Sequence, residues 1–215
     1  MIVIFISGAS GCGKTILSNL LKSHFEKLEK TCEILHLDDY FKEIPENRDL
    51  VDYKTTTDFT QLNLRDLSLL ASQILALNNG KEIVKPEYSF KTCKRTTIKK
   101  VFPAQFLIVE GTFILHFANI MPEFKNVFKT KLSQIGVYIK QSHYEETIAR
   151  RIMRDLKERG QTKESMAHLD HLYLRPAYIN IIEPSGRTAD IQIINDHQND
   201  LNNAIKDIID FITNK

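Results

Sequence analysis

The sequence is poor in cysteine, and its cysteines follow no recognisable pattern. Only Cys12, Cys32 and Cys93 occur among 215 residues, an odd number without C-x-x-C spacing. Neither a disulfide framework nor a zinc site is therefore expected, and a reducing, cytoplasmic setting is the simplest one. Internal repeats and low-complexity tracts are missing as well.

The chain also lacks an excess of charge of one sign and any long apolar run. Its 29 basic and 27 acidic residues leave a net charge of +2, so no strong field points to nucleic acid as the main partner. The apolar start covers only about six residues and leads directly into a glycine-rich loop. We interpret it as the first strand of a sheet, and expect neither a signal peptide nor a membrane span.

What the chain does contain is a phosphate-binding loop between a strand and a helix. The pattern G-x-x-x-x-G-K-[ST] follows an apolar run and precedes helical spacing, and it comprises Gly8, Ala9, Ser10, Gly11, Cys12, Gly13, Lys14 and Thr15. Glycines let several backbone N–H groups face one phosphate chain, Lys14 supplies a mobile cation, and Thr15 supplies a hydroxyl for Mg²⁺. The loop predicts binding of a nucleoside triphosphate, with ATP and Mg²⁺ as cofactors.

Strand-like and helix-like segments alternate along the rest of the chain. Apolar runs predict strands over 2–6, 32–37, 106–111, 135–139 and 189–194. Helical spacing predicts helices over 15–29, 58–77, 142–158, from 163 into the 170s, and over 201–212. Asp58 is expected to cap the second helix, residues 42–57 to be irregular, and residues 81–101 to form a β-hairpin. The sequence predicts a three-layer α/β/α fold of the P-loop NTPase type, with a mainly parallel five-stranded sheet.

Two carboxylates follow predicted strands and are expected at the edge that carries the phosphate loop. Asp38 could take a proton from a substrate hydroxyl, or it could simply cap a turn. Glu110 follows four apolar residues and is a candidate for the magnesium site with Thr15, or else a lone polar residue at a strand end. Together with Lys14, these groups supply what phosphoryl transfer requires.

A basic cluster follows on a predicted helix. Arg151 and Arg154 are three residues apart and share one helix face, and Arg159 stands before a glycine at position 160. Such a cluster suits a lid over residues 150–165 that closes on ATP, although a solvated basic face is the simpler alternative.

With these residues in place, the chain resembles the uridine kinases among the P-loop nucleoside kinases over nearly its whole length. The segments that carry the resemblance are G-A-S-G-C-G-K-T at 8–15, L-D-D-Y-F at 37–41, V-D-Y at 51–53, P-E-Y-S-F at 86–90, V-E-G at 109–111 and R-R-I-M-R-D-L-K-E-R-G at 150–160. The arginine-rich segment is the most specific of them.

The resemblance implies a role for each matching position. Asp38 would be the base that faces the ribose 5′-hydroxyl, and Asp52 would hold the 2′- and 3′-hydroxyls together with Arg151. Tyr88 would contact the base or the sugar. Arg154 and Arg159 would close on the phosphates.

Three positions depart from the family's pattern, and all three concern the nucleobase. Cys93 stands where uridine kinases usually have a histidine, Gln161 where they have an arginine, and Leu169 where they have a glutamine. The departures leave the type of reaction standing and put the identity of the base in question.

We therefore expect a single kinase domain over residues 1–215 that phosphorylates the 5′-hydroxyl of a ribonucleoside, uridine or cytidine. A small molecule, and neither nucleic acid nor a membrane, would be its partner, and the resemblance implies a homo-oligomer. The alternatives are a kinase of another hydroxyl compound (nicotinamide riboside, pantothenate or ribulose phosphate) and an ATP-binding regulator without catalysis. A GTPase is not expected, because N-K-x-D and D-x-x-G do not occur.

Overall fold

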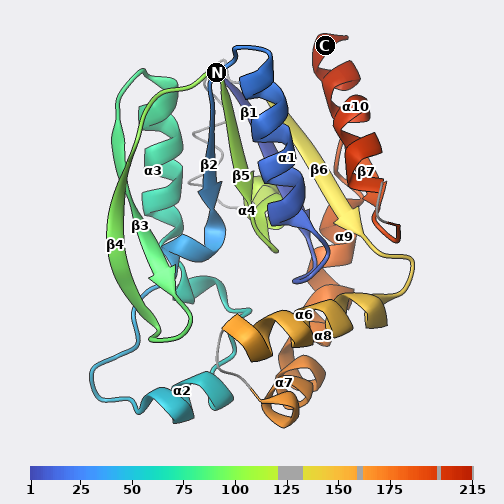
Figure 1. Ribbon diagram of the computed structural model, residues 1–215. Coiled ribbons are helices and arrows are strands. Elements are labelled where there is room, and N and C mark those ends of the chain that lie inside the picture. Colours follow the sequence, from blue (N-terminus) through green and yellow to red (C-terminus); the bar gives the residue numbers. More distant parts are fainter. Residues whose placement is uncertain (121–132, 159–161, 198–199, 215) are drawn as a thin grey trace.

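Five parallel strands form the central sheet of the protein, in the order β2-β5-β1-β6-β7 (Figure 1). In this computed structural model, residues 1–120, 133–158, 162–197 and 200–214 are described. The strands are β1 (Ile2–Gly8), β2 (Cys32–His36), β5 (Phe106–Glu110), β6 (Ser133–Lys140) and β7 (Ile191–Ile194). The predicted five-stranded parallel sheet is thereby confirmed.

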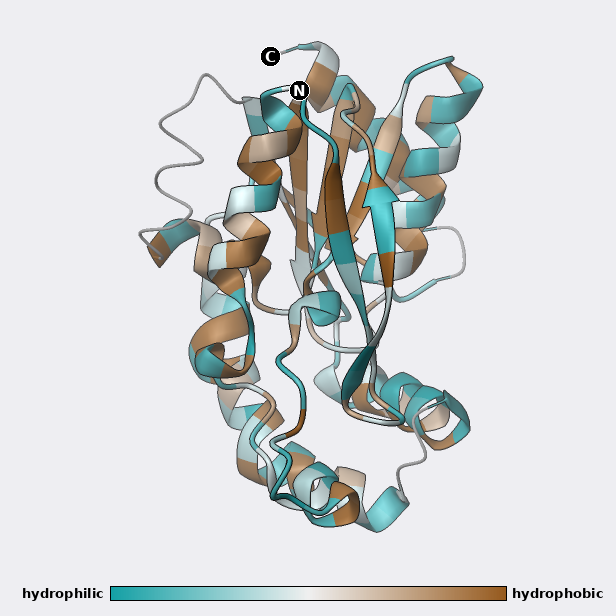
Figure 2. Ribbon diagram, turned by 90° about the vertical axis from the view of Figure 1, so that its left-hand side faces the viewer, coloured by the Kyte–Doolittle hydropathy of each residue, from teal (hydrophilic) through white to brown (hydrophobic). Residues whose placement is uncertain are grey.

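The central strands are buried on both faces, which explains their almost uninterrupted apolar sequences. In β1, Val3, Ile4 and Ile6 are completely buried. Parallel strands covered by helices on both sides select such runs rather than alternating patterns. In Figure 2 much of the central sheet and the inward faces of several helices are accordingly brown.

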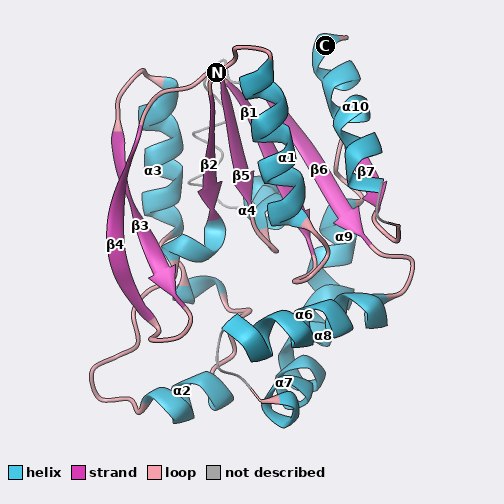
Figure 3. Cartoon of the chain, viewed as in Figure 1, coloured by secondary structure: helices cyan, strands magenta, loops and turns pink. Residues whose placement is uncertain are grey.

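Helices cover the sheet in two layers (Figure 3). One face is covered by α1 (Lys14–Lys27) and α10 (Asp200–Thr213), whose apolar side chains share a core with alternate residues of β1, β5 and β6. The other face is covered by α3 (Leu67–Asn78), α4 (Ile114–Ile120) and α9 (Glu183–Gly186). Both layers leave the carboxyl ends of the strands free for ligands.

Further elements surround that edge of the sheet. The hairpin predicted over residues 81–101 is present as the antiparallel pair β3 (Ile83–Ser89) and β4 (Lys94–Val101), and it is separate from the main sheet. Beyond the strand ends lie α2 (Leu50–Thr56), α6 (Tyr144–Glu158) and α7 (Lys163–Leu169) (Figure 1). Within the described ranges, no helix combines the length and the apolarity needed to cross a membrane.

Two expectations about the segment between β2 and α3 are wrong. Residues 42–57 are not wholly irregular, because Asp49 accepts from the backbone N–H groups of Val51 and Asp52 and so caps α2. Asp58 does not cap α3 but closes a turn onto Thr60, with which it makes two hydrogen bonds. The cap of α3 is Asp66, which accepts from Leu69 N–H at 3.1 Å.

Two short turns and one longer helical segment complete the chain. The turns are η1 (Leu37–Tyr40) and η2 (Leu62–Leu64). The helix expected from residue 163 continues much further, to Gly186, through wide turns at Asp170–Leu174 and Tyr178–Ile182.

Candidate active site

The phosphate loop follows β1, the central strand of the sheet. Gly8, Gly11 and Gly13 have φ angles of 147°, 98° and 107°, which residues with a Cβ rarely adopt. A Cβ at Gly11 would lie 2.6 Å from the carbonyl oxygen of Thr147 on α6. Glycine is therefore needed both for the shape of the loop and for the close approach of α6.

Lys14 opens α1 and turns back into the loop. Its Nζ donates to the carbonyl oxygens of Gly8 and Ala9 at 3.0 Å and 2.9 Å, and the residue is buried. Asn195, after β7, donates from Nδ2 to the carbonyl oxygen of Cys12 at 2.8 Å. These bonds hold the loop in a shape that brings its backbone N–H groups and one ammonium to the same side.

Three elements meet at the carboxylate of Glu110, which ends β5. Its Oε1 accepts from Thr15 Oγ1 at 2.8 Å and lies 2.8 Å from Nδ1 of His36 on β2. His36 and Glu110 stand opposite each other in the parallel register, so 74 residues of chain separate two groups in direct contact. The cluster brings together both residues predicted for a magnesium site, Thr15 and Glu110.

The surroundings shift the pKa of both partners in opposite directions. Burial alone would raise the pKa of Glu110, but the hydrogen bond from His36 and the charge of Lys14 bring it below its ordinary value. Burial alone would lower the pKa of His36, but its bond with Glu110 and the charges of Glu110 and Asp39 bring it above its ordinary value. Both shifts favour an ion pair.

This ion pair should make the stability of the protein depend on pH. A raised histidine pKa stabilises the fold fully below about pH 6.5 and loses that effect as the pH rises through the folded pKa. The lowered pKa of Glu110 stabilises the fold above about pH 4.3, and this contribution is lost as the pH falls through the folded pKa. We therefore expect His36→Gln to reduce the free energy of unfolding more at about pH 6 than at about pH 9.

Chemical denaturation at the two pH values measures this difference, and His116 offers a matched control. Burial lowers the pKa of His116, so His116→Gln should show the opposite trend, with its loss larger at the higher pH. Equal losses at both pH values for His36→Gln would contradict the ion pair.

Asp38 lies in η1, directly after β2. Its charge acts on Arg65 and on Tyr88. The neighbouring Asp39 forms an ion pair with Lys85 of β3 and accepts from the backbone N–H of Tyr88 at 3.3 Å. The hairpin is thus attached to the turn that carries Asp38, the predicted general base.

Two arginines of α6 share one buried carboxylate. Arg151 Nε lies 3.2 Å from Asp155 Oδ2, and Arg154 Nε donates to Asp155 Oδ1 at 2.7 Å. Arg154 also donates from Nη2 to Ser10 Oγ at 3.1 Å. Arg154 of the predicted basic cluster therefore reaches the phosphate loop.

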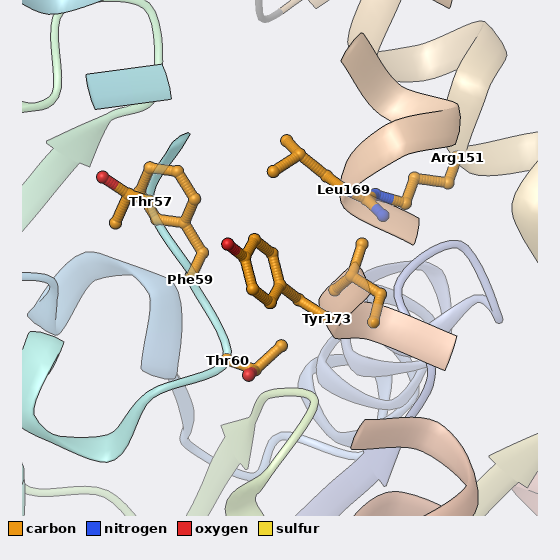
Figure 4. Close-up of a pocket in the computed structure, with 7 residues that line it drawn as sticks. Thr57, Phe59, Thr60, Arg151, Leu169 and Tyr173 are labelled. Carbon is orange, nitrogen blue, oxygen red and sulfur yellow. The ribbon is translucent and has the colours of Figure 1, made fainter. Parts of the chain in front are cut away.

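A pocket lies between α6, α7 and the loop that follows α2 (Figure 4). Its lining residues are Thr57, Phe59, Thr60, Arg151, Leu169, Tyr173 and Leu174. Arg151 also lines two neighbouring cavities, one of which reaches Ala9 and Ser10 and the other Phe90 and Cys93. Arg151 thus lines both this pocket and the cavity that reaches the phosphate loop.

Two of the predicted base-reading positions, Cys93 and Leu169, line the same cavity as Arg151. The hydroxyl of Tyr88 faces the Cys93 thiol, and burial raises the pKa of both groups. The Tyr88 ring packs 5.1 Å from that of Phe90. Phe90 and Cys93 line this cavity, and Tyr88 packs against both of them without lining it.

Asp52 is the residue that the resemblance assigns to the ribose together with Arg151. It lies on α2, is exposed, and accepts from Arg48 Nη2 at 2.7 Å. Arg151, its implied partner, is paired with Asp155 instead. Arg159 and Gln161 lie outside the described residues.

Several residues of the site were missed in the sequence. Asp155 follows Arg151 by four positions, a spacing that predicts a helical ion pair and could have been found. His36 and Lys85 have partners on other elements, and no local pattern indicates those contacts.

A phosphate loop after the central strand of a parallel sheet, with a carboxylate at the end of the neighbouring strand, defines the class of P-loop nucleotide-binding proteins. Solved structures share this fold: phosphoribulokinase from Rhodobacter spheroides has a TM-score of 0.62 at 16% identity, covering 90% of this chain and 69% of that one. D-glycerate 3-kinase from Cryptococcus neoformans has a TM-score of 0.57 at 16% identity, covering 90% and 85%.

The chain belongs to the Phosphoribulokinase / Uridine kinase family, whose model matches residues 3–202. A uridine kinase from Brevibacillus brevis is 32% identical over 197 residues, which cover 89% of this chain and 84% of that protein.

Proposed function

We propose that this protein is an ATP- and magnesium-dependent kinase of ribonucleosides that phosphorylates the 5′-hydroxyl of uridine or cytidine. The observation that carries the proposal is the place of Arg151, which lines both the cavity at Ala9 and Ser10 and the pocket at Phe59. One cation could therefore serve a phosphate donor and an acceptor at once. The relation to uridine kinases supports the nucleoside as acceptor.

The residues at the phosphate loop fit a nucleotide with its metal. Lys14 would leave the carbonyl oxygens of Gly8 and Ala9 for the β- and γ-phosphates. Thr15 and Glu110 offer the oxygen ligands that Mg²⁺ takes, directly or through water. Bound there, Mg²⁺ would neutralise charge on the phosphates during transfer.

Asp38 would accept the proton of the attacking hydroxyl. Its turn is anchored to the hairpin through Asp39 and Lys85, which limits the movement of the carboxylate. Arg154, already bonded to Ser10, would stabilise the charge that develops on the transferred group, together with Arg159.

A panel of acceptors tests the proposal. ADP release should be measured with uridine, cytidine, adenosine, nicotinamide riboside, pantothenate and ribulose 5-phosphate, and we expect the highest kcat/KM for the two pyrimidine nucleosides. A higher value for one of the other compounds would overturn the proposed acceptor and leave a kinase. Binding of ATP without turnover of any acceptor would indicate a regulator.

The carboxylate that holds the ribose is a separate question, for which the structure offers a second candidate besides Asp52. Asp58 lies between Thr57 and Phe59, which line the pocket with Arg151. We expect Asp58→Asn to raise the acceptor KM about tenfold or more, since a charge-assisted hydrogen bond to a diol is lost, and to weaken the preference for ribose over deoxyribose.

Asp52→Asn is the matched control for this prediction. It changes an exposed carboxylate and should leave both the KM and the sugar preference within about twofold of the parent. If Asp52→Asn instead raises the acceptor KM and weakens the ribose preference while Asp58→Asn changes neither, the ribose is held by Asp52, as the resemblance implies.

A further inference from the structure

Arg65 is a buried cation beside the acceptor pocket, and neither the sequence motifs nor the proposed mechanism uses it. The residue is 6% exposed and follows η2. Its Nη1 donates to the carbonyl oxygen of Gln61 at 3.1 Å and its Nη2 to that of Phe59 at 3.0 Å. Within the described part of the chain, Nε has no hydrogen-bond partner. One guanidinium thus spans the loop that lines the pocket.

The same guanidinium connects this loop to the segment that follows Asp38. It lies 4.1 Å from the centre of the Phe41 ring and 5.4 Å from that of Phe113. Phe41 and Arg65 also pair through their backbones, as in an antiparallel sheet. Arg65 therefore connects the 57–61 loop to the turn that carries Asp38, the predicted general base.

The positive charge of Arg65 interacts with carboxylates of the same two segments, Asp38 in η1 and Asp58 in the 57–61 loop. Burial lowers the pKa of Arg65 to about 10, while the charges of Asp38 and Asp58 act in the opposite sense and favour the cation. The group is therefore still protonated at neutral pH. A buried charge is costly unless its surroundings compensate it, and here the compensation comes from two carboxylates and an aromatic face.

We propose that Arg65 is a positioning residue of the acceptor site, which fixes residues 57–61 against Phe41 and thereby sets the distance between the acceptor pocket and Asp38. The inference rests on the proposed function. Arg65 itself would not touch the reacting atoms. Its effect on the reaction would pass through Phe59, which lines the pocket, and through the turn that carries Asp38.

Arg65→Lys separates this role from a general contribution to folding. Lysine keeps the positive charge and the apolar stem, but a single ammonium cannot reproduce the planar fork that reaches both carbonyl oxygens. We expect the KM of the best acceptor in the panel to rise about tenfold and kcat to fall by about tenfold, because the acceptor is held less well and lies less well placed against Asp38, while the KM of ATP stays within about twofold. Loss of folded protein would lower the apparent kcat and leave both KM values unchanged.

Arg95→Lys is a matched control, because Arg95 also donates to carbonyl oxygens of the η1 segment. Its Nε donates to the carbonyl oxygen of Phe41 at 3.1 Å. Arg95 belongs to the hairpin, however, and among the described bonds it makes none to the 57–61 loop. We expect all three kinetic constants to stay within about twofold in this variant.

A second variant keeps the inference open to refutation if Arg65→Lys does not fold. Phe41→Leu removes the ring under the guanidinium and no hydrogen bond, and it should raise the acceptor KM selectively as well. An unchanged acceptor KM in whichever of the two variants folds, or equal rises in the KM of acceptor and ATP, would overturn the role of Arg65. Turnover of no acceptor by the parent would instead overturn the proposed function.

Discussion

Lys14→Ala is expected to lower kcat by about 10²-fold or more, because a positioned positive charge on the transferring phosphates is the main contribution to catalysis in this chemistry. The side chain already lies within the phosphate loop, bonded to the carbonyl oxygens of Gly8 and Ala9. Steady-state ADP release with saturating ATP and acceptor measures the effect.

Lys22→Ala provides the control for that experiment. Lys22 belongs to the same helix but pairs with Glu33 at 3.4 Å, so its removal should leave kcat within about twofold. Turnover of Lys14→Ala within a few-fold of the parent would show that Lys14 has been misassigned.

The second large effect is expected at Asp38. Asp38→Asn keeps the size of the side chain and its capacity for hydrogen bonds but removes the base. The affinity for the nucleoside should therefore change little while kcat falls by about 10²–10⁴-fold. Equilibrium binding of the acceptor and single-turnover rates separate the two quantities.

Asp66→Asn is a suitable comparison, because asparagine preserves the cap of α3 and should preserve kcat. A variant at position 38 that loses affinity but keeps its rate at saturation would identify Asp38 as a binding residue instead.

The parts of the molecule that were predictable from the sequence depend on local patterns. The apolar run 2–6 and the glycines after it dictate a buried strand and a phosphate loop, so Lys14 and Thr15 could be placed without a structure. The region between β2 and α3 was harder, because Asp49, Asp58 and Asp66 are equally good caps in the sequence. Contacts with the rest of the fold decide among them: Asp66 N–H donates to the carbonyl oxygen of Tyr40 at 2.8 Å.

The site residues that escaped prediction are joined by contacts between distant segments. His36 touches Glu110 across two strands, and Lys85 reaches Asp39 from the hairpin. Neither residue has a characteristic spacing, and each finds its partner only once the sheet and the hairpin have formed. Asp52 was selected by a motif match, and in the fold it is exposed on α2 and paired with Arg48, so its contact with the ribose stays a prediction.

The register of the sheet has a consequence for how the protein becomes active as it folds. Glu110 stands opposite Ile6 on one side and His36 on the other, so both neighbouring strands must be aligned for the cluster to exist. A slip of one residue would turn the Glu110 carboxylate to the opposite face of the sheet. Pairing between such distant strands is slow to form, because the chain entropy is lost before the contacts are gained. We therefore expect refolding chains to regain nucleotide affinity only in the last kinetic phase, after most of their helical signal has returned.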